Sequence, residues 1–195
     1  MRNKKILITT IGIIVVGVIT ALVSIRISML NSIFPNPTLI QHQLNESILL
    51  NETSFTALDC QLISGTQLKQ MLPDYIDEVE NKDGSKVRDE QIRVILVRAK
   101  LKNTTSITQT IELVQMYAAS LVWSNGIDGD LFPRLNSDVK NPMLITLEPN
   151  QEIEVIIPYT MYDFQFSQEV WDNMQYTNFD LVLTFYPDKH FIKLI

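Results

Sequence analysis

The stretch Arg93–Ser106 reads RVILVRAKLKNTTS, and its residues alternate in character with a period of two. One face takes four apolar residues and the other takes three basic ones: Ile95, Val97, Ala99 and Leu101 against Arg98, Lys100 and Lys102. This alternation predicts a strand with one face on a core and the other in water. The polar turn cluster Asn103–Ser106 separates this segment from Ile107–Val114, so we expect the two segments to form an antiparallel hairpin.

Three other segments share this pattern: Ser54–Ile63, Glu152–Tyr159 and Phe179–Tyr186. Met116–Trp123 is a further apolar run, and a turn leads into the final segment Phe191–Ile195. In Ser54–Ile63 we expect Leu58, Cys60 and Leu62 on one side. Pro158 lacks an amide hydrogen, so its strand should lie at an edge of a sheet or end there. Six or seven short strands with no alternating helices predict a mainly β fold, an antiparallel sandwich over residues 54–195.

Two short helices are expected between the strands. Thr66–Leu72 stops at a proline, and Ser167–Met174 begins at a serine of the kind that caps helices. Thr38–Leu50 is ambiguous, because its apolar residues fit one helix face or a strand equally well. The acidic residues 74–90 are expected to form a solvated loop with a frayed helical turn; cation binding there is the alternative, without a recognisable ligand spacing.

The N-terminus carries the apolar run Ile6–Ile25, which contains no charged residue and follows Arg2, Lys4 and Lys5. About 20 apolar residues are what a helix needs to cross a bilayer. A core helix of a soluble protein would normally show a polar stripe, which is missing here. We therefore expect a segment that enters a membrane.

This run is interpreted as a permanent transmembrane anchor, with a cleaved export signal as the alternative. A signal has a shorter apolar region followed by a small-residue cleavage pattern, and neither is present. Three basic residues precede the run and only Arg26 follows it closely, so the positive-inside rule places the N-terminus in the cytoplasm. The expected order is a cytoplasmic tail at 1–5, the anchor at 6–25, a linker at 26–53 and an extracytoplasmic domain at the cell membrane.

Composition narrows the classes of function. The net charge is −6, which disfavours nucleic-acid binding, since phosphate contacts need clustered lysine and arginine. Cys60 is the only cysteine, so no internal disulfide can form, and its place in a strand predicts a buried, inert thiol.

The residues for catalysis are few. His42 and His190 are the only histidines, they are far apart in the sequence, and neither lies in a zinc-binding motif. The chain also has no glycine-rich loop for a nucleotide and no G-x-S-x-G motif. We therefore predict no enzyme activity, no cofactor and no metal site.

Three segments together carry a resemblance to a known class of domain: VRAKLKNTTSITQTIEL, ITLEPNQEIEVIIPY and FDLVLTFYPDKHFIKL. Their order resembles the telokin-like, immunoglobulin-type sandwich domains of uncharacterised membrane-anchored proteins and lipoproteins of Gram-positive bacteria. The shared motifs are the turns Lys102–Thr104 and Leu147–Gln151, within roughly Phe55–Leu194. The resemblance implies an immunoglobulin-like fold and an envelope location but no catalytic residues. The chain lacks the lipid-accepting cysteine of the lipoproteins.

The predicted function is a membrane-tethered, non-catalytic binding or accessory module. Its expected partners are the lipid bilayer, through Ile6–Ile25, and another envelope or membrane protein. The alternative is an envelope stress, immunity or transport-accessory factor that acts through its helix, for which the only hint is Gly12 and Gly17; a hydrolase has no motif behind it.

A candidate partner surface combines aromatic rings and carboxylates: Trp123, Asp128, Asp130, Phe132, Phe166 and Trp171. Exposed rings would favour an interface, because aromatic residues dominate binding hot spots. The alternative is that the tryptophans pack between the sheets and that the aspartates bond to their own loop.

Overall fold

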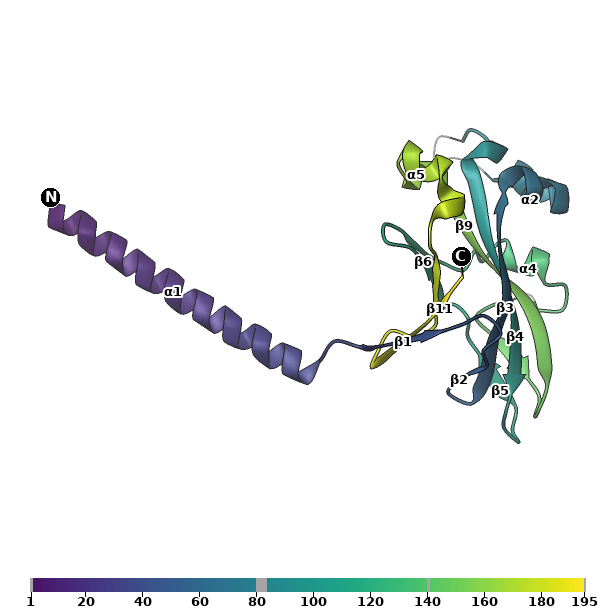
Figure 1. Ribbon diagram of the computed structural model, residues 1–195, viewed down its shortest axis with the longest axis horizontal. Coiled ribbons are helices and arrows are strands. Elements are labelled where there is room, and N and C mark those ends of the chain that lie inside the picture. The colour runs from purple at the N-terminus through teal and green to yellow at the C-terminus, as the bar shows by residue number, and fades with distance from the viewer. Residues whose placement is uncertain (1, 80–83, 140, 195) are drawn as a thin grey trace. The chain divides into compact units, whose positions relative to one another are not determined.

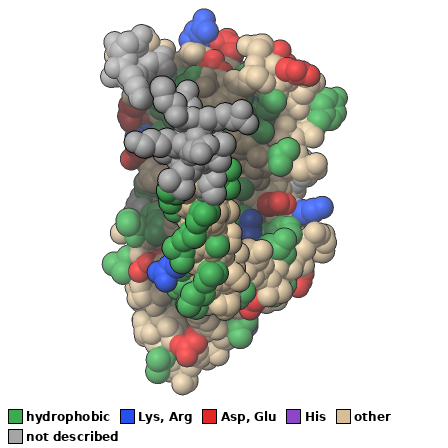
Figure 2. Space-filling model, turned by 90° about the vertical axis from the view of Figure 1, so that its left-hand side faces the viewer, with side chains coloured by type: hydrophobic (Ala, Val, Ile, Leu, Met, Phe, Trp, Pro, Cys, Tyr) green, Lys and Arg blue, Asp and Glu red, His purple; other side chains and the backbone are tan. Residues whose placement is uncertain are grey.

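A computed structural model describes residues 2–79, 84–139 and 141–194 of the chain (Figure 1). The chain divides into two units, one ending at Thr38 and the other beginning at Leu39. The first contains one long helix, α1 (Arg2–Ile33). Within it, Ile11–Ile33 is long and apolar enough to cross a membrane, with a mean hydropathy of 2.4. Figure 2 shows that the described side chains of this helix are mostly hydrophobic. The predicted N-terminal apolar helix is confirmed.

The second unit is a mainly antiparallel β-sandwich, as predicted. One sheet has five strands in the order β1 (Thr38–His42), β11 (Asp188–Lys193), β10 (Asp180–Val182), β6 (Tyr117–Ala119) and β7 (Ser124–Gly126). The other has four, in the order β2 (Ile48–Leu50), β3 (Thr53–Ser64), β4 (Ile92–Asn103) and β9 (Glu152–Tyr162). A separate pair is formed by β5 (Gln109–Ile111) and β8 (Ile145–Leu147).

Strand β4 is the centre of the four-stranded sheet. Its predicted inner face is confirmed, because Ile95, Val97, Ala99 and Leu101 are fully buried in the main core. The predicted hairpin with residues 107–114 is wrong. Both edges of β4 are already paired, one with β3 and the other with β9, so the following strand β5 pairs with β8 instead.

A β-bulge in β3 changes which residues face the core. Ala57 pairs with Ala99 and Asp59 with Arg98, so Leu58 is the extra residue. A bulge shifts the alternation by one position. Phe55 and Ala57 face the main core before it, and Cys60 and Leu62 pack on the same core after it. The sequence alternation that placed Leu58 beside Cys60 and Leu62 is therefore wrong at this one residue.

A second, smaller core lies at one end of the β3–β4 pair. There the helices α2 (Gly65–Met71), α3 (Pro73–Glu78) and η1 (Asp89–Gln91) follow or precede the strands. Buried residues of α2 and α3 form one cluster with those at the ends of the two strands and with Val87 and Leu131 from the loops: Ile63, Leu68, Tyr75, Ile76, Val87, Ile92, Val94, Leu96 and Leu131. The first predicted helix is confirmed as α2. Its N-terminus is capped by Ser64, which forms a reciprocal capping box with Gln67.

Glycine is required at position 65. A Cβ there would lie 2.1 Å from the carbonyl oxygen of Asp89, so any side chain would clash with the backbone of η1. The close approach of α2 to η1 therefore depends on this glycine.

The remaining helices are short: α4 (Phe132–Leu135), η2 (Asp163–Gln165), α5 (Gln168–Asp172) and η3 (Met174–Tyr176). The second predicted helix is confirmed as α5 and η3. The hydroxyl oxygen of Ser167 accepts a hydrogen bond from the Val170 amide at its start.

The globular unit begins earlier than the sequence suggested. Residues 38–50, left open as helix or strand, form β1 and β2, which pair with β11 and β3. The β2–β3 turn places Asn51 at a φ of 55°, a conformation that asparagine tolerates better than most residues. The predicted linker 26–53 is therefore divided between the end of α1 and the first strands of the sandwich, which starts at Leu39 rather than residue 54.

The outer edge of β9 is covered by β7 and the chain segment that follows it. Asn136 exchanges two hydrogen bonds with the backbone of Ile156, at 2.8 and 2.9 Å. The amide of Asp128 donates to the carbonyl of Pro158 at 2.9 Å, and Asn125 donates to the carbonyl of Thr160 at 3.0 Å. Pro158 thus lies in an edge strand, as predicted, and other parts of the same chain satisfy that edge.

Removing the hydroxyl of Tyr159 is expected to leave the free energy of unfolding unchanged or to raise it by up to about 1 kcal/mol. This side chain is fully buried, and its hydroxyl has no hydrogen-bond partner among the described residues. Tyr159→Phe therefore removes a desolvated polar group and keeps the ring. Thermal unfolding of the full chain measures this.

The matched control is Tyr75→Phe. The Tyr75 hydroxyl donates to Asp128 at 2.9 Å, so this variant should lose about 1–2 kcal/mol. Equal losses in the two variants would contradict the assignment of Tyr159 as unpaired.

Candidate ligand-binding cleft

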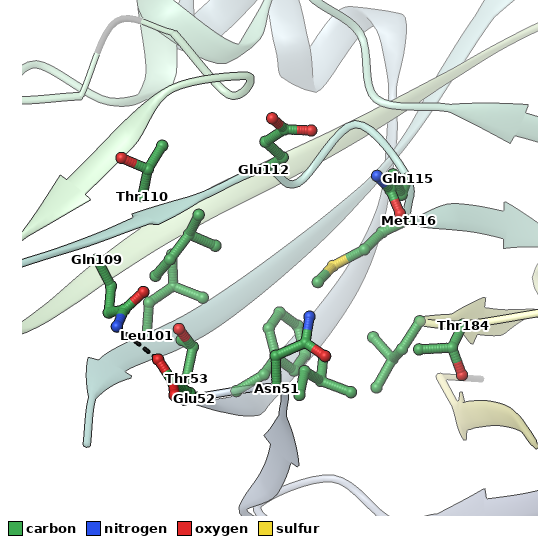
Figure 3. A pocket seen from close by; sticks show the side chains of 14 residues that line it. Asn51, Glu52, Thr53, Leu101, Gln109, Thr110, Glu112, Gln115, Met116 and Thr184 are labelled. Atoms are coloured by element: carbon green, nitrogen blue, oxygen red, sulfur yellow. Dashed lines mark hydrogen bonds between the residues drawn. The ribbon is translucent and has the colours of Figure 1, made fainter. Parts of the chain in front are cut away.

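A cleft of about 720 Å³ opens between the β2–β3 turn, β4, β5 and the end of β10 (Figure 3). Its apolar part contains four side chains that are at most 5% exposed, Phe55, Leu101, Met116 and Leu183, together with the partly buried Leu50 and Ile111. Its rim consists of exposed polar side chains: Asn51, Glu52, Thr110, Glu112 and Gln115. An apolar base with a few polar groups around it is the usual composition of a small-ligand site.

The rim of the cleft is acidic. Glu52 and Glu112 line it, and none of its lining residues is a lysine or arginine. Glu52 accepts a hydrogen bond of 2.6 Å from the side-chain amide of Gln109, as Figure 3 shows. Glu112 has no ion pair or hydrogen bond from its side chain within the described parts of the chain. The arrangement therefore favours a ligand that carries positive charge.

The buried side chain of Asn103 positions one wall of the cleft. Its amide nitrogen donates to three carbonyl oxygens, those of Ile107 at 2.7 Å, Leu147 at 3.0 Å and Glu148 at 3.1 Å. Its oxygen accepts from the amide of Thr105 at 2.9 Å. These bonds turn the chain away from β4 and hold β5 against β8, so that β5 lines the cleft.

Sequence reasoning missed this site. None of the six residues predicted as a partner surface lines the cleft. Asn103 itself was recognised, but only as part of a polar turn. Nothing in the local sequence shows that its side chain joins β5 to β8, because Leu147 and Glu148 lie more than 40 positions away.

The aromatic residues of the predicted partner surface lie mainly in the core. Trp123, Phe132 and Trp171 are buried, and Phe166 is partly buried against them. Ring centres lie 5.9 Å apart between Trp123 and Phe166, Trp123 and Phe179, and Phe166 and Trp171. The structure thus has the rings packed between the sheets, which is the alternative that the sequence left open, and it does not present them as an interface.

The two aspartates of that surface differ in environment. Asp130 is exposed. Asp128 accepts four hydrogen bonds: Oδ1 from the amides of Asp130 and Leu131, at 3.1 and 2.9 Å, and Oδ2 from the hydroxyls of Tyr75 and Thr160, at 2.9 and 2.5 Å. Asp128 therefore organises its own loop and fastens it to α3 and β9. Within the described residues, no three or more metal-ligating side chains gather in one place.

The thiol of Cys60 is partly buried and packs against the main core. Burial raises the pKa of this thiol to about 12, with the nearby Asp59 carboxylate as a smaller cause. The thiol is thus protonated at neutral pH and a poor nucleophile, in line with the inert role predicted for it.

The two histidines, which the sequence analysis considered separately, lie in contact. His42 in β1 and His190 in β11 are joined by a hydrogen bond of 2.9 Å between ring nitrogens. Only the pairing of the first strand with the last brings them together, and the ambiguity of residues 38–50 concealed that pairing.

These features define a class: a β-sandwich protein with an N-terminal apolar helix and an acid-rimmed cleft at one end of the sandwich. More particularly, the chain belongs to the family described as "Domain of unknown function (DUF5028)", which matches residues 44–190. No curated protein matches the chain significantly. The telokin-like, immunoglobulin-type assignment stays a prediction.

Solved structures with a similar course of the chain come from Gram-positive bacteria. An uncharacterised β-sandwich protein from Clostridium difficile 630 is 11% identical, with a TM-score of 0.47, over 82% of this chain and 97% of that one. The yjhA protein from Bacillus subtilis is 12% identical, with a TM-score of 0.46, over 79% and 99%. A putative lipoprotein (ycdA) from Bacillus subtilis is 10% identical, with a TM-score of 0.43, over 78% of this chain and 38% of that one.

Proposed function

We propose that this protein is a membrane-tethered, extracytoplasmic, non-catalytic binding module, and that its ligand occupies the cleft beside β5. The observation that carries the proposal is the cleft itself. Its volume of about 720 Å³ falls within the range of ligand pockets. It places buried apolar side chains below exposed polar ones, and no sequence motif for catalysis accompanies it.

The location follows from the N-terminus. The apolar helix is preceded by Arg2, Lys4 and Lys5, and the positive-inside rule keeps such an end in the cytoplasm. A helix that crosses the membrane from there delivers the sandwich to the outside. The acidic rim would then meet envelope components, and those carrying an amine or guanidinium group beside apolar atoms fit it best.

Cysteine labelling tests the orientation and the cleft together. In a Cys60→Ala background, Gln115→Cys places a thiol at the cleft and Lys86→Cys places one on an exposed segment outside it. Both should react with a membrane-impermeant maleimide on intact cells. The thiol at position 115 should react more slowly in cells than in the purified full chain, because a ligand covers the cleft in cells. The thiol at position 86 should react at the same rate in both.

A charge reversal provides the control. Glu112→Lys should remove the protection of Gln115→Cys, because it places a positive charge at the acidic rim, whereas Glu90→Lys, an exposed position outside the cleft, should not. Labelling only after lysis would contradict the orientation. Equal rates at the cleft in cells and in the purified chain would contradict an occupied cleft.

A further inference from the structure

The contact between His42 and His190 has a well-defined geometry. The ring nitrogens Nε2 of His42 and Nδ1 of His190 are 2.9 Å apart. The ring planes differ by 11° and the ring centres are 5.2 Å apart. The difference between the two distances is about twice the radius of an imidazole ring, so both nitrogens lie on the line between the ring centres. The rings therefore meet edge to edge in nearly one plane rather than stacking face to face.

The pair is extended by a carboxylate. Nδ1 of His42 lies 2.7 Å from Oε1 of Glu46, and the other oxygen of Glu46 accepts from the amide of Gln43 at 3.0 Å. An ionised carboxylate can only accept, so Nδ1 of His42 carries a proton. Chiefly through this bond, and secondly through the Gln43 amide, the pKa of Glu46 is lowered. The network thus runs from an anion through one imidazole to another.

The number of protons in the network decides whether it holds. A nitrogen–nitrogen hydrogen bond needs one proton between the two atoms. With both rings neutral, His190 donates to His42. One added proton is accommodated, either on Nε2 of His190, whose Nδ1 continues to donate, or on Nε2 of His42, which then donates once the His190 proton has moved from Nδ1 to Nε2. In both cases His42 remains bonded to Glu46 and to His190. A second added proton puts a hydrogen on both facing nitrogens, which removes the bond and sets two cations against each other.

The strand that carries His42 has little else to hold it. β1 is the edge of its sheet, with β11 as its only neighbour among the described strands, and none of its five residues is fully buried. Leu39 is 67% exposed. Four residues, Phe34–Pro37, separate β1 from the end of α1. Edge segments with few buried contacts are those that open locally at low cost.

We propose that Glu46, His42 and His190 form a proton-sensitive clasp that fastens β1 to β11 at neutral pH and releases it in acid. Release frees Thr38–Gln43, because Leu44 packs on the main core and the amide of Asn45 donates to the carbonyl of Ala57 at 2.7 Å. Six extended residues span roughly 20–22 Å. The length of chain between the apolar helix and the sandwich is then set by pH. This device is independent of any ligand in the cleft.

The direction of the pH dependence follows from proton counting. In the released strand both histidines can be charged, whereas the clasp accepts only one of those two charges. The released state therefore binds one more proton in acid, and the clasp loses stability as the pH falls below the range in which histidine ordinarily titrates, near ~6.5. Once both rings of the released strand are charged, the equilibrium constant for attachment of β1 to β11 should fall about tenfold for each unit by which the pH is lowered.

Other charged groups near the pair do not change this sign. Asp188 and Lys189 precede His190 in β11 and carry opposite charges. Among the described contacts, neither forms an ion pair with either ring, and Glu46 is the only charged side chain bonded to the network.

Hydrogen exchange of the full chain in lipid nanodiscs tests the clasp. After correction for the intrinsic rate, protection of the amides of residues 39–43 should fall about tenfold between pH 5.5 and 4.5. Protection of the central strand β4 should remain unchanged. Undiminished protection of residues 39–43 at pH 4.5 would overturn the proposal.

Two variants identify the titrating groups. His190→Gln keeps a group that can donate to or accept from His42 but does not titrate, so the acid loss of protection should disappear. Glu46→Gln keeps an acceptor but removes its charge, so release should begin at a higher pH than in the parent chain. A loss of protection in His190→Gln equal to that of the parent would show that the histidine pair is not the sensor.

Discussion

Replacement of Asn103 by alanine is expected to lower the free energy of unfolding by about 3–4 kcal/mol. The side chain is completely buried, and it satisfies three carbonyl oxygens and the amide of Thr105. Its removal takes away the side-chain partner of the Leu147 carbonyl and of the Thr105 amide, whereas the carbonyls of Ile107 and Glu148 keep bonds from the Thr105 hydroxyl and the Gln151 amide. Each unsatisfied buried group costs about 1–3 kcal/mol. Equilibrium denaturation of the full chain, followed by tryptophan fluorescence, measures the loss.

Two further variants make this prediction specific. Asn103→Asp has nearly the same shape but cannot donate, and it brings a carboxyl group beside the carbonyls of Leu147 and Glu148, so it should be at least as destabilising as alanine. Ser106→Ala changes an exposed residue of the same turn and should stay within about 0.5 kcal/mol of the parent chain. A loss below about 1 kcal/mol for Asn103→Ala would mean that the turn is held by other contacts.

The second large effect is expected at Asp128. Asp128→Ala removes all four hydrogen bonds of the carboxylate and should cost about 3 kcal/mol, because the hydroxyls of Tyr75 and Thr160 lose their acceptor. Asp128→Asn should cost less, since an amide oxygen at Oδ1 still accepts from Asp130 and Leu131. Asp130→Ala is the matched control, expected within about 0.5 kcal/mol.

The same denaturation measurement separates these cases. Equal losses for the alanine variants at 128 and 130 would contradict the distinct roles of the two carboxylates. Since the predicted partner surface contained both residues, this comparison also shows how much of that segment serves folding. A stable Asp128→Ala protein would leave the segment available for binding.

The alternation around β4 was sufficient to predict the class of fold from the sequence. It fixes which side of Arg93–Lys102 faces the main core, because a period of two admits only one assignment of faces. It does not show that Val94 and Leu96, on the opposite side, are buried in the second core. The pairing of strands was less accessible. The hairpin expected after Asn103 does not form, since the neighbours of β4 are chosen by contacts with β3 and β9, far away in the sequence.

The candidate site could not be predicted for a similar reason. Glu52 and Glu112 are unremarkable as exposed glutamates, and they share a cleft only because β5 leaves one sheet and pairs with β8. His42 and His190 stand 148 positions apart and meet because the first strand lies beside the last. The local sequence pattern identifies buried faces and the starts of helices. A site whose residues are far apart in the sequence and meet only through strand pairing leaves no signal in that pattern.

The covered edge of β9 has a consequence for association with other chains. An open edge strand offers a row of unpaired amides and carbonyls to which a strand from a second molecule can add, and such addition can propagate into fibres. Along β9 that row is interrupted by Pro158 and bonded by Asn125, Asp128 and Asn136 of the same chain. An intruding strand would have to displace all three residues to add between Ile156 and Thr160, so this stretch of the edge is protected against polymerisation.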